Sequence, residues 1–541
     1  MKSFILSAVL APVLVTVAQA KTVTVDGQDS AAIAAAIAES QPGDVVQLPA
    51  GTCTITEAVT PKSGTKLVGA GQDKTILRFA GEKLSVMVLL SGCEDTTVSE
   101  LTLDGAGNPK VTAGVFADNA KRLSILRITV RDLVKGEGGF GRHGIHFNGE
   151  NPTREHAVTD SVIADCHLEN IGVGDAFGCG IRMSWGSSRN QVTGCTIRTT
   201  GRGGIFGDNG SNDLIIRHNT VSGSGGERLG IEVWGGCDRC VIEDNRLDHW
   251  LSIGGCDWCA VRRDTISATD GTFGFIGIEA IGSYLVFTDN VVGDGQVIGL
   301  SVSSTQPKQY VYYGDNTFRR CTQWGAQFQG ESGGIAYQYL YRCRFVDTTV
   351  GRGTVPYPGD EGHGFRTNGD TNHLVLEECE MRDNGRFGVQ LGGEQVDCLS
   401  FARCVISGNK AAAVVGPGGY HPGAPGAYDA LEWVDCTVEG NAANDLPPAK
   451  PFPHAAPTAG FDAPSKATVG QPVTFVSQAK AAEGGIAKVL WDFGDGPPAV
   501  GDNTSWTYTR PGKYRVTQIV WDNSGRGARA ERTVEVTARQ G

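Results

Sequence analysis

The sequence predicts an all-β protein, a parallel β-helix followed by a small β-sandwich, on three observations. Between Asn212 and Gly236, the short runs LIIRH, TVSGS and GIEVW alternate apolar and polar residues, as strands with one buried face do. A unit of this size cannot bury its apolar face alone, and it recurs at intervals of roughly 25 residues, the period of a stacked solenoid. Near the C-terminus the runs lengthen to the spacing of a sandwich.

One position at the first bend of each repeat sets the expected register of the coils. It holds Asn, Asp or Cys, and a small side chain at this place can stack on the coils above and below. Two apolar residues upstream, Leu101 and Ile128, fit the same register. The bend residues are Cys166, Cys195, Asn219, Asn245, Asp264, Asn290, Asn316, Cys343, Cys379, Cys404 and Cys436.

The N-terminal segment 1–20 has the pattern of a secretory signal, with Lys2, an apolar run from Phe4 to Val17, and Ala18-Gln19-Ala20. The apolar run is too short to span a bilayer, so we expect a secreted or periplasmic protein. Next, Asp29-Ser30 precedes the run AAIAAAIAES, which predicts an amphipathic helix with a capping residue at its start. Such a helix would cover the exposed strand edge of the first coil.

The chain from Val23 to Asn444 resembles the right-handed parallel β-helix proteins of the pectate lyase superfamily, whose coils carry an asparagine ladder at this bend. The segments WDFGDG (Trp491–Gly496) and YTRPGKYRVTQIVWDNSG (Tyr508–Gly525) resemble a polycystic kidney disease (PKD) domain. We therefore expect a right-handed β-helix over 21–444, a linker rich in Pro and Ala over 445–458, and a PKD-like sandwich over 459–541. The resemblance implies that the sandwich acts as a spacer or helps to hold a polymeric substrate.

The composition of the chain limits the classes of molecule that it is expected to bind. The net charge of −12 argues against nucleic acid as the main partner, whereas a local basic patch would still allow an acidic polysaccharide. We expect a monomer with a polysaccharide partner. The 76 glycines fall at the turns of the repeat, which is not a collagen or disordered composition.

Fifteen cysteines occur, and Cys237, Cys240, Cys256 and Cys259 have the spacing of a four-cysteine zinc site. The two pairs are separated by one short coil, so the repeat alone would bring them into register. Stacked free thiols, and after them inter-coil disulfides such as Cys237–Cys256, are therefore favoured over a metal. No metal site and no catalytic cysteine is predicted.

In the resembled family, the strand entered from the glycine-rich turn lines the substrate groove. Along these strands the residue after Gly points inward and the next one outward. One outward column is His146, Arg182, Phe206, Glu232, Ser252, Glu279, Ser301, Gln327, Arg366 and Gln390. A second is Asn148, Ser184, Asp208, Trp234, Ser303, Gln329 and Asn368. Charges, amides and flanking tryptophans on one face are typical of a sugar-binding surface.

The predicted catalytic residues are Glu232, Asp208 and Glu279, and the predicted substrate-binding residues are His146, Arg182, Trp185, Trp234, Trp250, Gln327 and Arg366. Glu232 and Glu279 should lie about 9.5 Å apart by strand spacing, within the range of inverting glycosidases. No basic residue of its own column adjoins Glu232, so we expect an unpaired carboxyl beside Trp234 with a raised pKa, as a general acid requires. The structural alternative is that these carboxylates form ion pairs with arginines.

β-Elimination from a uronate would use other residues of the same groove. Arg182, Arg366 or His146 would act on the substrate, while Asp208 and Glu232 would hold Ca²⁺. Gly362-His363-Gly364 matches part of the polygalacturonase pattern, but its Asn-Thr-Asp, the pectate lyase signatures and the Asp-Pro-His-Asp of alginate epimerases are absent. The sequence therefore predicts cleavage of a polysaccharide, which could contain uronate, by hydrolysis or β-elimination. The alternative is a non-catalytic binding or cell-surface structural protein.

Overall fold

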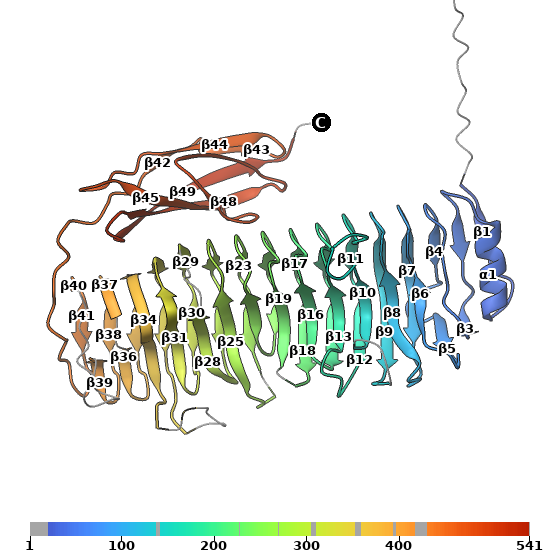
Figure 1. The fold of residues 1–541 in the computed structure, drawn as a ribbon, viewed down its shortest axis with the longest axis horizontal. Coiled ribbons are helices and arrows are strands. Elements are labelled where there is room, and N and C mark those ends of the chain that lie inside the picture. The colour runs from blue at the N-terminus through green and yellow to red at the C-terminus, as the bar shows by residue number, and fades with distance from the viewer. Residues whose placement is uncertain are drawn as a thin grey trace, which may run out of the picture.

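The computed structural model describes residues 20–136, 141–226, 228–268, 270–304, 310–351, 357, 359–392, 396–416 and 430–539. Residues 1–19 of the expected secretory signal lie outside them. Figure 1 shows a long stack of coils that begins at α1 and ends at β41, with a separate sandwich lying along one side of the stack.

The stack is one parallel sheet system of 41 strands among the described residues. The three runs between Asn212 and Gly236 form β17 (Ile215–Arg217), β18 (Thr220–Ser224) and β19 (Leu229–Trp234). Each pairs in parallel with the equivalent strand of the next coil: β17 with β20, β18 with β21 and β19 with β22. The predicted parallel β-helix is confirmed.

The stack contains a groove sheet and a flank sheet. The groove sheet comprises β10 (His143–Phe147), β13 (Cys179–Met183), β16 (Gly203–Asp208), β19, β22 (Leu251–Gly254), β25 (Gly274–Ile281), β28 (Gln296–Ser304), β31 (Trp324–Ile335), β34 (His363–Glu377) and β36 (Phe387–Leu391). The flank sheet comprises β20 (Val241–Glu243), β23 (Ala260–Arg262), β26 (Val286–Thr288), β29 (Val311–Gly314), β32 (Gln338–Tyr341), the later part of β34, β37 (Val396–Ala402) and β40 (Leu431–Val434).

The predicted bend residues stack in one column. The side-chain amide of Asn219 donates to Asn245 Oδ1 (3.0 Å), Asn245 donates to Asp264 Oδ1 (2.9 Å), and Asn290 donates to Asn316 Oδ1 (2.9 Å). These bonds hold the coils in register, because each buried amide finds its partner one coil away. A second ladder, in which Asn384 donates to Asn409 and Asn409 to Asn441, was not predicted.

The predicted N-terminal helix is α1 (Ser30–Glu39), and the Asp29 side chain caps it by accepting a hydrogen bond from the Ala32 backbone N–H (2.9 Å). It buries Ile33, Ala36 and Ile37 against the first coils. The apolar face of the helix therefore covers the end of the stack, as expected.

None of the fifteen cysteines forms a disulfide, and all of them lie within the described residues. The Cys237 backbone N–H donates to Cys256 Sγ (3.2 Å), so the two pairs stack coil on coil. Within the described residues no three of the Cys237, Cys240, Cys256 and Cys259 sulfurs come within 4.8 Å of one another. This arrangement is that of stacked thiols in the apolar core.

The C-terminal sandwich has two sheets. One contains β42 (Phe461–Asp462), β44 (Pro472–Ser477) and β47 (Asn503–Thr507), and the other contains β43 (Lys466–Thr468), β49 (Gly527–Thr537), β48 (Gly512–Asp522), β45 (Ile486–Asp492) and β46 (Ala499–Val500). Phe461, Phe475, Trp491 and Phe493 pack in its core. The chain between β41 (Thr437–Glu439) and β42 contains no strand or helix of its own.

Candidate functional site

The groove sheet has the register that the sequence predicts. His146 pairs with Arg182, Arg182 with Phe206, and Phe206 with Glu232. The column continues through Ser252, Glu279, Ser301, Gln327, Arg366 and Gln390. Asp208 and Trp234 pair in the second column.

A short coil interrupts one wall of this groove. The ladder residues Asn245 and Asp264 are 19 residues apart, whereas the intervals on either side are 26 residues. Most of the missing residues come from the end of the second strand and the glycine-rich turn: Leu251 follows Asn245 by six positions, whereas its strand partner Ile231 follows Asn219 by twelve. The second strand of the short coil is β21 (Arg246–Leu247). Trp250, next to β22, takes the position that Gly230 holds in the preceding coil.

A cleft of about 460 Å³ opens at this coil. It is lined by Phe177, Arg182, Arg202, Phe206, Asp208, Asn209, Leu229, Glu232, Trp234, Trp250 and Glu279. All three predicted catalytic carboxylates therefore lie in one cleft, together with Arg182, Trp234 and Trp250.

Two arginine–carboxylate pairs form the floor of the cleft. Arg182 Nη2 lies 2.6 Å from Asp208 Oδ2, and Arg202 Nη2 lies 2.8 Å from Glu232 Oε2. The Phe206 ring lies between the two guanidinium groups, 5.3 Å from the Arg182 Cζ and 5.1 Å from the Arg202 Cζ. Stacking on the ring helps to fix both cations in the plane that their carboxylates require.

Asp208 is 2% exposed. Burial raises the pKa of this carboxyl above its usual value, although the charge of Arg182 acts in the opposite direction. Within the described residues its Oδ1 atom has no hydrogen-bond partner. Asp208 can therefore keep a proton at a higher pH than an ordinary aspartate does.

The expected environment of Glu232 was wrong. Arg202 donates three hydrogen bonds to its carboxylate, at 3.1, 2.9 and 2.8 Å, so Glu232 is not unpaired. A column contains only strand residues, whereas Arg202 lies in the turn between β15 (Thr196–Thr200) and β16. Glu232 is also 6% exposed, so its replacement is not a surface change.

Glu279 accepts a hydrogen bond from the Ser252 hydroxyl (2.6 Å). Ser252 lies between Glu232 and Glu279 in the column, so two strand spacings, about 9.5 Å, separate the two glutamates along the sheet.

Aromatic rings border the cleft on both sides. The Trp234 side chain is 48% exposed and lies across Gly254, where an added Cβ would meet Trp234 Cε3 at 2.0 Å. On the opposite side, Trp250 meets Phe275 edge to face at 6.4 Å, and Phe177 is 43% exposed. Exposed rings on either side of a polar floor are suited to stacking on sugar faces.

Four predicted binding residues, His146, Trp185, Gln327 and Arg366, do not line the cleft. His146 lies one coil from Arg182, with Nε2 2.9 Å from the Ser184 hydroxyl, and burial holds its pKa well below the usual value. Trp185 is half-buried in the turn after β13.

Gln327 and Arg366 belong to a second cluster farther along the groove sheet. Arg366 stacks over Trp324 (4.3 Å) and donates to Gln327 Oε1 (3.1 Å). Arg366 also faces Asp360 (3.4 Å), which pairs with His363 (2.9 Å). Burial alone would raise the pKa of Asp360, but the hydrogen bond from His363 and the charge of Arg366 bring it below its usual value.

The calcium site expected for an elimination mechanism does not fit these residues. Asp208 and Glu232, its proposed ligands, each accept hydrogen bonds from an arginine that already neutralises the carboxylate. A divalent cation beside Arg182 and Arg202 would be repelled by both guanidinium groups.

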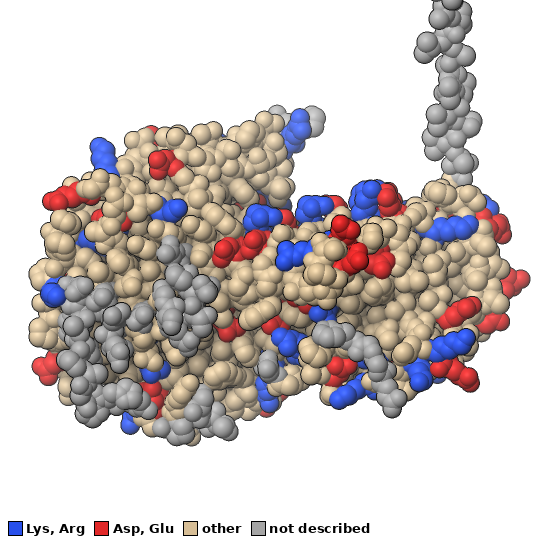
Figure 2. All heavy atoms as spheres, viewed as in Figure 1, with Lys and Arg blue, Asp and Glu red and all other residues tan. Residues whose placement is uncertain are grey.

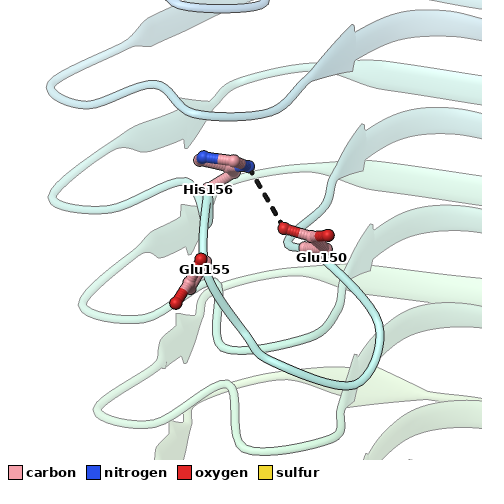
Figure 3. A group of neighbouring side chains, drawn as sticks. All are labelled: Glu150, Glu155 and His156. Carbon is pink, nitrogen blue, oxygen red and sulfur yellow. Dashed lines mark ion pairs between the residues drawn. The ribbon is translucent and has the colours of Figure 1, made fainter.

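One group among the described residues has the spacing of a cation site. Figure 3 shows Glu150, Glu155 and His156 in the exposed loop after β10, with ligand atoms within 4.8 Å of one another and His156 3.4 Å from Glu150. None of the three lines the cleft. On the face seen in Figure 2, basic and acidic side chains are interspersed rather than gathered into a patch of one sign.

Comparisons with known proteins match both parts of the chain. The model described as "Right handed beta helix region" matches residues 86–247 and 250–424, and the model described as "PKD domain" matches residues 454–538. The microbial collagenase of Vibrio alginolyticus is 38% identical over 89 residues, 16% of this chain and 11% of that protein. Collagenase ColQ1 of Bacillus cereus is 38% identical over 82 residues, 15% of this chain and 8% of that protein. This chain thus spans about a tenth of the length of the curated relatives that it matches.

Among solved structures, the N-terminal fragment of the bacteriophage phi29 gene product 12 has a TM-score of 0.50 at 15% identity. The match covers 81% of this chain and 73% of that one, and at this identity it shows the fold alone. Within the described residues, no helix is long and apolar enough to cross a membrane.

Proposed function

This chain belongs to the right-handed β-helix family, and on that premise we propose that it is a secreted or periplasmic enzyme that cleaves a polysaccharide in the cleft beside β22. One observation carries the proposal: Asp208, Glu232 and Glu279 line a single cleft bordered by exposed aromatic rings. Paired carboxylates beneath stacking platforms are what glycoside hydrolysis needs.

The environments of two carboxylates support separate roles. Asp208, whose pKa is raised by burial and which lines the cleft, would act as the general acid and protonate the glycosidic oxygen. Glu232, which accepts three hydrogen bonds from Arg202, would act as the base that activates water. They lie one strand spacing and two residues apart, about 8 Å, which is within the range of inverting hydrolysis.

Other residues of the cleft would bind and position the sugar. Trp234 and Trp250 would stack on its faces, and Glu279 would accept hydrogen bonds from its hydroxyl groups. Polysaccharide stacked along the groove sheet would then place one linkage between Asp208 and Glu232.

A second function, binding a polysaccharide without cleaving it, is favoured by one specific observation. Asp208 and Glu232 are each neutralised by an arginine, at 2.6 Å and 2.8 Å, as in a purely structural ion pair. The two functions differ in their products, so a single assay separates them.

The test is incubation of the purified full chain with a panel of neutral and acidic glycans. New reducing ends with inverted anomeric configuration, observed by NMR, support the hydrolytic proposal. Unsaturated ends that absorb ultraviolet light would replace it with β-elimination, and binding without either product would replace it with the binding function. Glu169→Gln, an exposed substitution on β12 (His167–Ile171), serves as the control that leaves the cleft unchanged.

A further inference from the structure

A ladder of side chains along one bend of the β-helix changes its chemistry midway. In the N-terminal coils this position alternates acid and base, with Arg122 bound to Asp95 (2.7 Å), Arg189 to Asp160 (2.6 Å) and Arg239 to Asp213 (2.7 Å). From the next coil onward the same position is aromatic. The aromatic ladder comprises Trp258, Tyr284, Tyr310, Tyr337 and His373, stacked at 4.1, 5.7, 4.8 and 4.8 Å.

The C-terminal sandwich covers the aromatic ladder. Trp521 meets the Tyr310 ring edge to face at 5.3 Å, and Lys488 Nζ lies over Tyr284 (5.5 Å) and Tyr310 (5.3 Å). One buried apolar cluster spans both parts, joining Leu490, Ile519 and Trp521 to Val286, Tyr310, Tyr312, Tyr339, Tyr341 and Val375. Figure 1 shows β45 and β48 of the sandwich facing the stack. A row of rings that would otherwise form an exposed apolar patch is thus partly covered: Tyr310 is buried, and Trp258, Tyr284, Tyr337 and His373 are half-buried.

Charged residues along the neighbouring bend also bind the C-terminal sandwich. In each coil, one residue directly precedes the residue of the asparagine ladder. At this position an arginine binds an acid of a neighbouring coil in two places: Arg263 binds Asp244 (2.8 Å), and Arg342 binds Glu378 (3.0 Å). Between them two acids, Asp289 and Asp315, occupy consecutive coils, and like charges at this spacing repel. Arg515 of the sandwich donates to both, at 2.7 Å and 2.6 Å, and so supplies the missing cation.

Buried ion pairs complete the contact. Arg262 on β23 is 1% exposed and binds Asp492 of the sandwich at 2.5 Å and the Gly496 carbonyl at 2.8 Å. Glu243 on β20 is 2% exposed and accepts hydrogen bonds from Arg263 of its own part and Arg510 of the sandwich. Charges this buried require fixed partners, so their positions specify one docking geometry.

We infer that the flank sheet with its aromatic ladder is a dedicated docking surface whose partner is the C-terminal domain of the same chain. The domain acts as a fixed side support of the coils from β20 to β40 and not as a mobile spacer. Because β25, β28 and β31 of the groove belong to these coils, the docked domain also supports the groove sheet from the strand that carries Glu279 onward.

The test cuts the chain between the β-helix and the C-terminal domain while both fragments stay in the same sample. A protease recognition sequence inserted after Ala455, which is exposed, allows the connection to be cut in the folded full-length chain. We expect the two fragments to co-elute in size-exclusion chromatography at micromolar concentration. Separation of the wild-type fragments under these conditions would overturn the inference.

Charge reversal tests the specificity of docking. Arg515→Glu places a third acid beside Asp289 and Asp315 and should weaken the association of the cut fragments at least 100-fold, so that they separate. Lys513→Glu makes the same charge change two residues away on β48, at an exposed position, and should leave them associated. Equal behaviour of the two variants would contradict the assigned role of Arg515.

A compensating double variant distinguishes a loss of the ion pairs from misfolding of the Arg515→Glu variant. Asp315→Arg combined with Arg515→Glu restores an ion pair of opposite orientation and should restore co-elution. If the single Arg515→Glu variant separates and the double variant does not recover, the effect of Arg515 is not an electrostatic one and that part of the inference is wrong.

Discussion

Asp264 is the one acid in a ladder of asparagines, and Asp264→Asn tests the stacking energetics directly. Its Oδ1 accepts hydrogen bonds from the Asn245 backbone N–H (2.7 Å) and side chain (2.9 Å). Within the described residues its Oδ2 has no partner. The equivalent Asn290 side chain donates both to the Val261 carbonyl and to Asn316, and a carboxylate can make neither bond. Burial raises the pKa of Asp264 to about 8.

The size and sign of the effect follow from this pKa. An aspartate has a pKa of about 4 in the unfolded chain, so the folded form holds its proton more tightly between pH 4 and 8. Over this range the aspartate of the unfolded chain is ionised while the buried one stays protonated, so rising pH favours the unfolded chain by about 1.4 kcal/mol per pH unit, roughly 4 kcal/mol at pH 7. Asparagine carries no charge, so Asp264→Asn should increase the free energy of unfolding by a few kcal/mol at pH 8 and by much less at pH 4.5.

Urea unfolding of wild type and variant at these two pH values, followed by circular dichroism, measures the difference. Asp165→Asn, at an exposed residue beside the ladder, is the matched control and should show no such pH-dependent gain. The reasoning is refuted if Asp264→Asn is less stable than wild type at pH 8, or if its advantage does not grow with pH.

Three further predictions concern the cleft. Arg202→Gln leaves the Glu232 carboxylate buried without its guanidinium partner and should destabilise the protein by about 2–3 kcal/mol in thermal or urea unfolding. The expected loss is smaller than for a fully buried ion pair because Arg202 is 25% exposed, and a loss under about 0.5 kcal/mol would contradict this role. If Asp208 is the general acid, activity should fall as pH rises through its raised pKa, and Asp208→Asn should lose at least 100-fold in rate together with that limb of the pH profile, whereas an unchanged profile would exclude this role. Gly254→Ala should displace the Trp234 ring, because the added Cβ would lie 2.0 Å from Trp234 Cε3. Glycan binding should then weaken about tenfold in a tryptophan fluorescence titration, without a change in melting temperature. An unaltered affinity would show that Trp234 does not stack on the sugar.

The register of the β-helix could be predicted from sequence because one small side chain per coil must stack on the next. Asn219, Asn245 and Asn290 therefore appear at a recognisable spacing, and counting outward from the glycines gave the groove column correctly. Turns have no such constraint. Their lengths vary from coil to coil, so counting along the strands does not place a turn side chain, and the pairing of Arg202 with Glu232 was missed.

The cleft itself has a signal in the sequence. The interval of 19 residues between Asn245 and Asp264 marks the coil without a glycine-rich turn, and Trp250 replaces the repeated glycine there. The docking surface has one as well, since Tyr284, Tyr310 and Tyr337 recur at the coil period. Neither signal shows what covers or fills the surface, because that depends on contacts between distant segments.

The measurement that tests the proposed function most directly is the rate of reducing-end formation by wild type and by Glu232→Gln on a glycan that wild type binds. Glutamine keeps the shape of the side chain and can still contact Arg202, and circular dichroism will establish that the variant is folded. The cleft mechanism predicts cleavage by wild type and a rate at least 100-fold lower for Glu232→Gln, with binding of the glycan retained. A folded variant that cleaves at the wild-type rate, or a wild type that binds glycans and cleaves none, would contradict it.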